Sequence, residues 1–299
     1  MTWTARPLGP HATVLVGEQG GKYPHGNALL VRGASATVII DPSLSVVGAT
    51  EGLPPVDRVV NGHVHEDHVA GNHCFPDATW HVPAEDLPGI RTLDGLMDIY
   101  GFDAPTAAAF RPVVVEQFHF TPRADAVPYA HGAVFDLGGG VRVRAIHAPG
   151  HTRGHSFLHV EPDDVLYLGD VDLSSFGPYY GDAWSCLEDF ERTLAMARTL
   201  EARWYATFHH VGVLEGRTAF VERLDRFAGV IASREAALLA FLSEPRTMAE
   251  VVARRFVYRP GAAVPYADQV ERRSMSQHIA RLAAAGRVRE VESGRWVAG

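Results

Sequence analysis

The stretch Gly62-His63-Val64-His65-Glu66-Asp67-His68 decides how the rest of this chain is interpreted. It brings three imidazoles and the carboxylate of Asp67 together within the six residues from His63 to His68. Residues 56–60, just before it, are expected to form a short buried strand. The cluster therefore stands where a strand ends and a loop begins, and a rigid sheet edge can fix ligands that a loop still exposes.

The spacing of these side chains predicts a metal site. In an extended segment His63 and His65 point the same way and can share one ion. Asp67 and His68 can then serve a second ion a few Å away. Imidazole and carboxylate without thiolate suit zinc or a neighbouring divalent metal. A solvated His-rich loop is the alternative, and we disfavour it because the cluster is compact and stands at a strand end.

Three later predicted strands also end in a histidine or an aspartate. After the first of them, a Pro149-Gly150 turn can aim His151 back over the sheet. The second, residues 165–170, ends in Asp170, and the third is followed by the doublet His209-His210. One such strand end could arise by chance, but four in this order are hard to obtain by accident.

With these residues the chain resembles the metallo-β-lactamase fold superfamily over roughly residues 10 to 225. The resemblance rests on four motifs: His63-x-His65-x-Asp67-His68, Pro149-Gly150-His151-Thr152-x-Gly154-His155, Gly169-Asp170 and His209-His210. It implies an α/β fold, a four-layer αββα sandwich with a binuclear metal centre at one edge.

The resemblance also implies a ligand set. His63, His65 and His151 would bind the first metal; Asp67, His68 and His209 would bind the second; and Asp170 would bridge both. His210 stays open as the alternative to His209, and His155 is expected outside the ligand set. The implied cofactors are two divalent metal ions, with zinc favoured over iron or manganese.

The implied activity is that of the hydrolase branches, such as type II glyoxalases and lactonases. Asp170 stands where β-lactamases of the zinc-Cys type have a cysteine, and neither Cys74 nor Cys186 falls in a motif. We expect hydrolysis of a small-molecule ester, thioester or lactone by a water whose pKa two cations lower from ~16 towards ~7. Asp67 is the expected catalytic residue, accepting the proton of that water. The alternative class is a nucleic-acid protein, either a metal-dependent nuclease or a ligand-responsive winged-helix binder.

Residues near the motifs have further expected roles. Asp41, at a strand end, is expected either to orient a metal ligand or to cap the following turn. His73 and His81 lie off the motifs and are not expected to be ligands. Residues 86–135 contain several prolines and aromatics, and we expect an irregular segment that forms a lid or pocket wall.

Composition restricts the class of protein. The 299 residues are 46% hydrophobic and carry a formal charge of −8, which disfavours a general nucleic-acid binder. No apolar run approaches the ~20 residues that a membrane span needs. Residues 1–10 lack the pattern of a secretory signal, and two cysteines cannot build a disulfide framework. We therefore expect a cytoplasmic protein that acts on a small-molecule substrate and does not engage a membrane.

Charge and pattern divide the chain into a catalytic domain, residues 1–228, and a winged-helix-like domain, residues 229–299. Residues 230–299 contain 11 Arg and 7 acidic residues, a net +4 that leaves −12 on the remainder. We expect helices over residues 234–242, 248–256 and 272–285, then a hairpin over 288–297. Arg272, Arg273 and Arg281 can meet phosphates. We favour instead a module that packs on the catalytic part or forms a homodimer.

Overall fold

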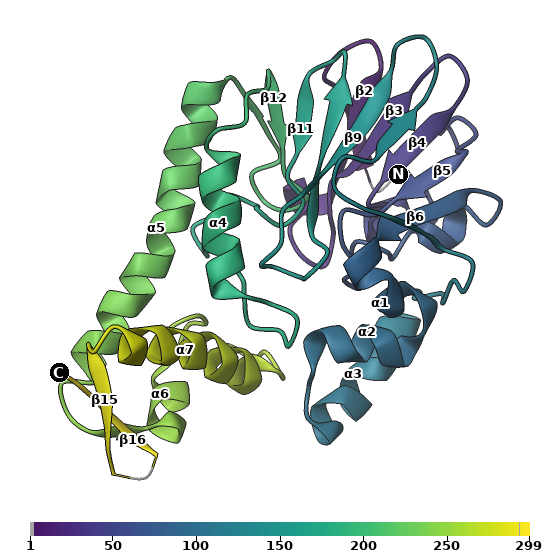
Figure 1. The fold of residues 1–299 in the computed structure, drawn as a ribbon. Coiled ribbons are helices and arrows are strands. Elements are labelled where there is room, and N and C mark those ends of the chain that lie inside the picture. The colour runs from purple at the N-terminus through teal and green to yellow at the C-terminus, as the bar shows by residue number, and fades with distance from the viewer. Residues whose placement is uncertain (1–2, 293) are drawn as a thin grey trace.

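The computed structural model describes residues 3–292 and 294–299, and two β-sheets lie face to face at its centre (Figure 1). Ser293, in the turn of the predicted hairpin, and the first two residues lie outside this description. The first sheet has seven strands in sequence order, β1 (Trp3–Pro7), β2 (Ala12–Gly17), β3 (Ala28–Arg32), β4 (Thr37–Ile40), β5 (Arg58–Val60), β6 (Thr79–Pro83) and β7 (Val127–Tyr129). It is antiparallel from β1 to β4 and parallel from β4 to β7.

The second sheet has six strands in the order β13-β12-β11-β10-β9-β8. Only β11 and β12 pair in parallel; the other pairs are antiparallel. The strands are β8 (Val134–Asp136), β9 (Arg142–His147), β10 (Ser156–Glu161), β11 (Val165–Tyr167), β12 (Trp204–Ala206) and β13 (Val213–Glu215). The predicted α/β sandwich of mixed sheets is therefore present.

Alternation along the central strands builds two hydrophobic cores at once. Val38 and Ile40 of β4 point into the core between the sheets, whereas Ile39 points into the core beneath the helices. Leu29 and Leu30 of β3 divide in the same way. Because successive side chains of a strand face opposite sides, such a strand must be apolar throughout. Burial on both faces fixes the positions of the strand ends.

Helices cover the outer faces of both sheets. α1 (Leu87–Arg91), α2 (Leu93–Tyr100) and α3 (Ala104–Glu116) pack on the first sheet, and α4 (Leu187–Ala197) and α5 (Arg217–Phe241) pack on the second. The expectation of an irregular segment over residues 86–135 was wrong for the part that forms these first three helices. Pro88 and Pro105 stand in the first turns of α1 and α3, where a helix needs no backbone donor from the ring nitrogen.

The C-terminal elements lie at the far end of α5 and have their own core (Figure 1). They are β14 (Arg246–Thr247), α6 (Met248–Arg254), α7 (Ala267–Ala284), β15 (Val288–Glu292) and β16 (Arg295–Ala298), with the sheet order β14-β16-β15. The helix predicted over residues 234–242 is the end of α5. The predicted boundary between residues 228 and 229 falls inside this continuous helix, which contributes Phe227 to one core and Leu238 to another. The division into two domains stays a prediction.

Among the described helices, none has the length and apolar character needed to cross a membrane.

Candidate metal centre

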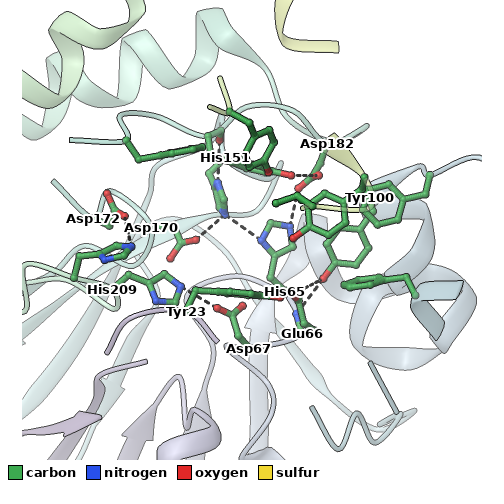
Figure 2. Close-up of a pocket in the computed structure, with 18 residues that line it drawn as sticks. Tyr23, His65, Glu66, Asp67, Tyr100, His151, Asp170, Asp172, Asp182 and His209 are labelled. Carbon is green, nitrogen blue, oxygen red and sulfur yellow. Dashed lines mark hydrogen bonds and ion pairs between the residues drawn. The ribbon is translucent and has the colours of Figure 1, made fainter. Parts of the chain in front are cut away.

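The predicted ligands gather at one edge of the sandwich, at the inner end of a pocket (Figure 2). The loop after β5 that carries His63 to His68 is held by the buried carboxylate of Asp86. This carboxylate accepts hydrogen bonds from the backbone of Val64 (3.3 Å) and from the hydroxyl of Thr152 (2.6 Å). It also accepts one from the backbone of Gly154 (2.9 Å). Asp86 thus ties the first histidine loop to the loop that carries His151, and the sequence motifs did not reveal it.

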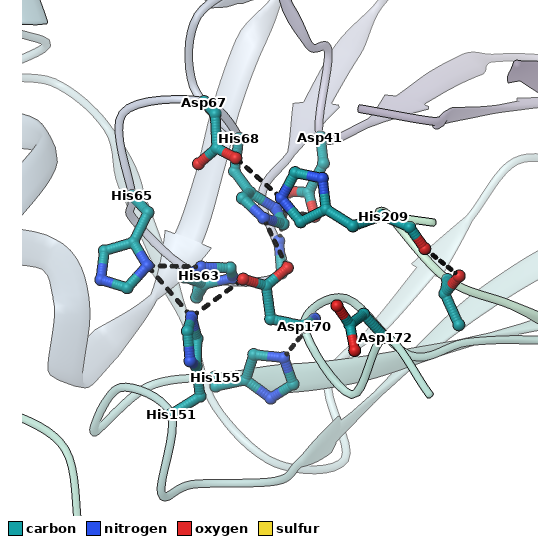
Figure 3. A network of polar contacts seen from close by, with 12 residues as sticks. Asp41, His63, His65, Asp67, His68, His151, His155, Asp170, Asp172 and His209 are labelled. Atoms are coloured by element: carbon teal, nitrogen blue, oxygen red, sulfur yellow. Dashed lines mark hydrogen bonds and ion pairs between the residues drawn. The ribbon is translucent and has the colours of Figure 1, made fainter. Parts of the chain in front are cut away.

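Three buried histidines converge in a first group (Figure 3). His63 Nε2 lies 3.1 Å from His65 Nδ1, which lies 3.0 Å from His151 Nε2. His63 and His65 both lie in the loop after β5, and they meet through different ring nitrogens. Together with Asp170 these side chains form a group that can hold a metal ion.

A second group consists of Asp67, His68 and His209. Asp67 Oδ2 lies 2.9 Å from His209 Nε2. His210 points elsewhere: its ring is 39% exposed and its Nε2 lies 4.0 Å from Asp172. Of the two histidines left open by the sequence, the geometry therefore brings His209 into the group.

Asp170 lies between the two groups. Its Oδ2 is 3.1 Å from His151 Nε2, and its Oδ1 is 2.9 Å from His68 Nε2. The backbone N–H of Asp170 donates to His155 Nε2 (3.1 Å), whose other ring nitrogen faces the backbone oxygen of Ala148 (2.9 Å). Burial, then the neighbouring His151, lowers the pKa of His155 to about 3, so the ring is neutral and can accept this bond. His155 thus supports the backbone of Asp170 and lies outside both groups.

Gly169 makes this approach of His155 to Asp170 feasible. Its φ is +52°, and a Cβ at this position would lie 2.7 Å from His155 Nε2. A larger residue would therefore be strained by its backbone and would displace the imidazole.

The contacts of the histidine ring nitrogens show whether these residues suit a metal ion. Four of the histidines direct one nitrogen at an acceptor outside the groups and the other nitrogen inward. The outer acceptors are Asp182 Oδ2 for His65 (3.1 Å), Asp41 Oδ2 for His68 (2.8 Å), the Tyr179 oxygen for His151 (3.0 Å) and the Gly21 oxygen for His209 (2.8 Å). When the outward ring nitrogen carries the proton, the inward nitrogen keeps a free electron pair. This is the form of imidazole that binds a metal. The residues therefore fit divalent cations.

Asp41 resolves the alternative that the sequence left open. One carboxylate oxygen faces His68 and also accepts the hydroxyl of Tyr167 (3.0 Å). The other accepts the backbone N–H of Gly62 (2.7 Å). Asp41 orients a member of the second group and anchors the start of the histidine loop.

Protonation differs between the two groups. Burial, and then the nearby rings of His68, His65 and His151, holds the pKa of His63 well below its ordinary value. Burial also acts to lower the pKa of His209, but the hydrogen bond to Asp67 and the charge of Asp170 outweigh it and raise this pKa to about 9. His63 is thus a neutral imidazole, whereas His209 is an imidazole paired with a carboxylate.

The pocket in front of the two groups has a volume of about 300 Å³. One side is formed by members of the groups and by neighbouring carboxylates, and the other is aromatic (Figure 2). The aromatic lining residues are Tyr23, Tyr100, Phe102, Phe110, Phe176, Tyr179, Tyr258 and Tyr266. Part of the segment 86–135 does form a pocket wall, as expected, through Tyr100 of α2, Phe110 of α3 and Phe102 in the connection between these helices.

The sequence analysis did not find three acidic residues of this wall, Glu66, Asp172 and Asp182. Asp182 contacts His65 and accepts the hydroxyl of Tyr179 (2.9 Å). Glu66, inside the first motif, accepts the hydroxyls of Tyr23 (3.0 Å) and Tyr100. Asp182 stands in no recognisable motif, and the partners of Glu66 come from distant parts of the chain. Only the fold brings them together.

Comparison with known proteins shows the family of this chain. Residues 23–229 match the family model of the metallo-beta-lactamase superfamily. Since the match covers more than half of the chain, the chain belongs to the metallo-beta-lactamase superfamily.

Three individual proteins illustrate the similarity. An acyl-coenzyme A thioesterase from Bos taurus is 30% identical over 165 residues, or 48% of this chain and 57% of that protein. A hydroxyacylglutathione hydrolase from Methylococcus capsulatus is 28% identical over 224 residues, or 71% of this chain and 75% of that protein. The chain thus spans little more than half the length of the first relative.

The third is a solved structure, a metallo-beta-lactamase family protein from Thermus thermophilus. It superposes with a TM-score of 0.72 over 98% of this chain and 100% of its own, at 22% identity. This similarity concerns the fold alone, and it extends over the C-terminal elements as well as the sandwich.

Proposed function

We propose that this protein is a binuclear metal-dependent hydrolase that cleaves a small-molecule thioester. The observation that carries the proposal is the placement of Asp170, whose two oxygens face His151 of one group and His68 of the other. A carboxylate in this position can be shared by two cations. Two separate groups without such a residue would suggest independent sites.

The proposed ligands follow the two groups. His63, His65 and His151 would hold one ion, Asp67, His68 and His209 the other, and Asp170 both. The donors are nitrogen and oxygen without thiolate, which favours zinc and also admits iron or manganese. When bound, two such ions would lower the pKa of a water molecule and polarise the substrate carbonyl.

The protein's own groups would supply proton transfer and positioning. Asp67 lines the pocket, so its carboxylate can accept a proton from the attacking water while it faces His209. Asp41 and Asp182 hold the rings of His68 and His65 in fixed orientations. The aromatic wall opposite excludes bulk water from the reacting carbonyl and so strengthens the electrostatic interactions there.

The two curated relatives support the choice of thioester over simple ester or lactone. One is named an acyl-coenzyme A thioesterase and the other a hydroxyacylglutathione hydrolase. Acyl transfer from sulfur to water is the reaction that both names share. At 30% and 28% identity this is support for a reaction class rather than for a particular substrate.

For the C-terminal elements we propose a winged-helix-like unit that serves packing. The order of helices and strands and the sheet order β14-β16-β15 support this description. Two of the three arginines considered for phosphate binding have partners within the chain. Arg273 donates to the backbone oxygens of Tyr100 (2.6 Å) and Gly101, and Arg281 pairs with Glu191 (2.9 Å) and Glu235. We therefore do not propose nucleic-acid binding.

The test is a screen of zinc-loaded protein against thioesters, lactones, phosphodiesters and RNA. We expect thioester hydrolysis that strong chelator abolishes and added zinc restores. Hydrolysis of RNA or phosphodiesters with no turnover of any thioester would overturn the proposal.

A further inference from the structure

The C-terminal unit contributes directly to the pocket in front of the proposed metal centre. Tyr258, Val264 and Tyr266, all from the connection between α6 and α7, line the pocket together with His65 and His151. Tyr266 stacks on Phe102 with ring centroids 5.1 Å apart. The pocket is thus completed by a segment that lies outside the matched family region, residues 23–229.

This connection is held in place from behind by the buried carboxylate of Glu271. It accepts the backbone N–H groups of Phe256 (2.9 Å), Val257 (2.9 Å) and Tyr258 (2.8 Å). Three donors to one buried carboxylate fix the backbone at Tyr258, because leaving the charge or the donors unpaired would be costly. The wall at Tyr258 is therefore preformed.

The other end of the connection is held through α7. Gln269 accepts the backbone N–H of Asp103 (2.8 Å) and donates to Thr106 (2.7 Å). Arg273 binds the end of α2 through the backbone oxygens of Tyr100 and Gly101. The face of α7 that carries Gln269 and Arg273 packs against the catalytic part. Tyr266, just before α7, is therefore held against Phe102.

The charges around the pocket limit what can enter it. Within the described part of the chain, the residues that line it include neither lysine nor arginine. Glu66, Asp172 and Asp182 lie in the wall. Glu66 accepts two tyrosine hydroxyls, Asp182 accepts the hydroxyl of Tyr179 and lies 3.1 Å from His65, and Asp172 accepts the backbone N–H of Ser174. An anionic group held away from the metal centre would meet carboxylates, with no lysine or arginine among the lining residues to pair with it. A cationic group would lie beside the two cations that the proposed centre holds.

We infer that the connection between α6 and α7 sets substrate specificity, and that the pocket takes the uncharged, apolar acyl group of the thioester. This inference rests on the proposed function and refines it. Aromatic faces and a volume of about 300 Å³ suit a compact aliphatic or aryl group. Tyr258 and Tyr266 act as specificity-determining residues that contact this group, and Glu271 positions Tyr258.

The experiment uses the zinc-loaded full chain and acyl thioesters of one thiol, N-acetylcysteamine. The acyl chains have matched length and end in a methyl, a carboxylate or a trimethylammonium group. We expect kcat/KM for the methyl-ended substrate to exceed that for either charged one by at least about tenfold. A preference for either charged end would contradict the inference.

Variants then test the segment itself. Tyr266→Ala and Tyr258→Ala should move the preferred acyl chain to a greater length and lower kcat/KM for short chains by at least about tenfold. Tyr266→Phe and Tyr258→Phe keep the ring and should retain the original chain-length profile. Arg272→Ala, an exposed position on α7 outside the pocket, is the matched control and should leave the profile unchanged.

The outcomes separate this inference from the proposed function. If no thioester is hydrolysed by zinc-loaded wild-type protein, the proposed function fails first. If thioesters are hydrolysed but the chain-length profiles of Tyr266→Ala and Tyr258→Ala match that of Arg272→Ala at equal metal content, the proposed function stands and the inference fails. Zinc content and thermal midpoint, measured for every variant, distinguish lost specificity from lost folding.

Discussion

The carboxylate of Asp170 faces both groups of proposed ligands, with one oxygen towards His151 and the other towards His68. Replacing it with Ala would leave two cations facing each other with less negative charge between them. We expect Asp170→Ala to lose one metal and at least about 100-fold in turnover while the sandwich stays folded. Asp170→Asn should also be poor, because an amide is a neutral and weaker ligand.

His155→Ala is the matched comparison for Asp170, because His155 contacts the same residue only through its backbone. Its metal content and turnover should fall less than those of either Asp170 variant. Metal content and turnover of the three variants, measured side by side, check this order. The reverse order, with both metals kept in Asp170→Ala and lost in His155→Ala, would show that the ligand set is wrong.

A substitution at Asp41 tests whether the orientation of His68 matters for metal binding. Asp41→Asn keeps the shape of the side chain, but its amide cannot serve both His68 and Gly62 as the carboxylate does. We expect metal affinity to fall about 10–100-fold, as it does when a partner of a metal-binding histidine is removed. Competition with a chromophoric chelator measures this directly. An unchanged affinity would show that the contact to His68 has no bearing on the site.

At the scale of elements, α7 docks on the catalytic part around a buried histidine. The ring of His278 contacts Tyr180 (2.9 Å) and Glu235 (3.3 Å), and Arg281 lies beside it. Burial first, and then the charge of Arg281, lowers the pKa of His278 to about 4 from 6.5, against the opposing effect of Glu235. The docking therefore uses the neutral ring.

The protonation of His278 makes the stability of the folded chain depend on pH. In the unfolded chain His278 binds a proton below about pH 6.5. In the folded chain it binds one only below about pH 4. Stability is therefore lost as the pH falls through this window, by roughly 2 kcal/mol between pH 6.5 and pH 5 for a single proton.

His278→Gln removes this titration and keeps a polar group near Tyr180. Urea midpoints of wild type and variant, compared at pH 7.5 and pH 5 with equal metal content, isolate the contribution of His278. We expect the variant to lose less stability on acidification than the wild type. Equal losses would mean that the ring does not stay neutral in the folded chain.

At the scale of the whole molecule, the sequence predicted the sandwich and the positions of the motifs better than it predicted the pocket. The motif histidines and aspartates could be located because each follows a strand, and strand ends of a sandwich meet at one edge. Asp182, Tyr258 and Tyr266 could not, because no local pattern distinguishes a pocket tyrosine from a core one. Their proximity depends on how α7 docks, which is decided by long-range contacts such as that of Arg273 with Tyr100.

The helices over residues 87–116 were missed for a local reason. Pro112, Pro122 and Pro128 were taken as signs of an irregular segment, but Pro112 lies within α3. Pro88 and Pro105 stand in first turns, which tolerate proline. The continuity of α5 was missed because its pattern changes where it leaves one core and enters the next.

We propose that two divalent ions, shared through Asp170, are needed for hydrolysis. The most direct measurement is a titration of metal-free protein with zinc, in which bound zinc per chain and turnover of a methyl-ended acyl thioester are followed together. We predict that turnover rises to its full value only as binding approaches two zinc ions per chain. Full turnover with no bound metal, or in strong chelator, would show that hydrolysis does not need the two ions.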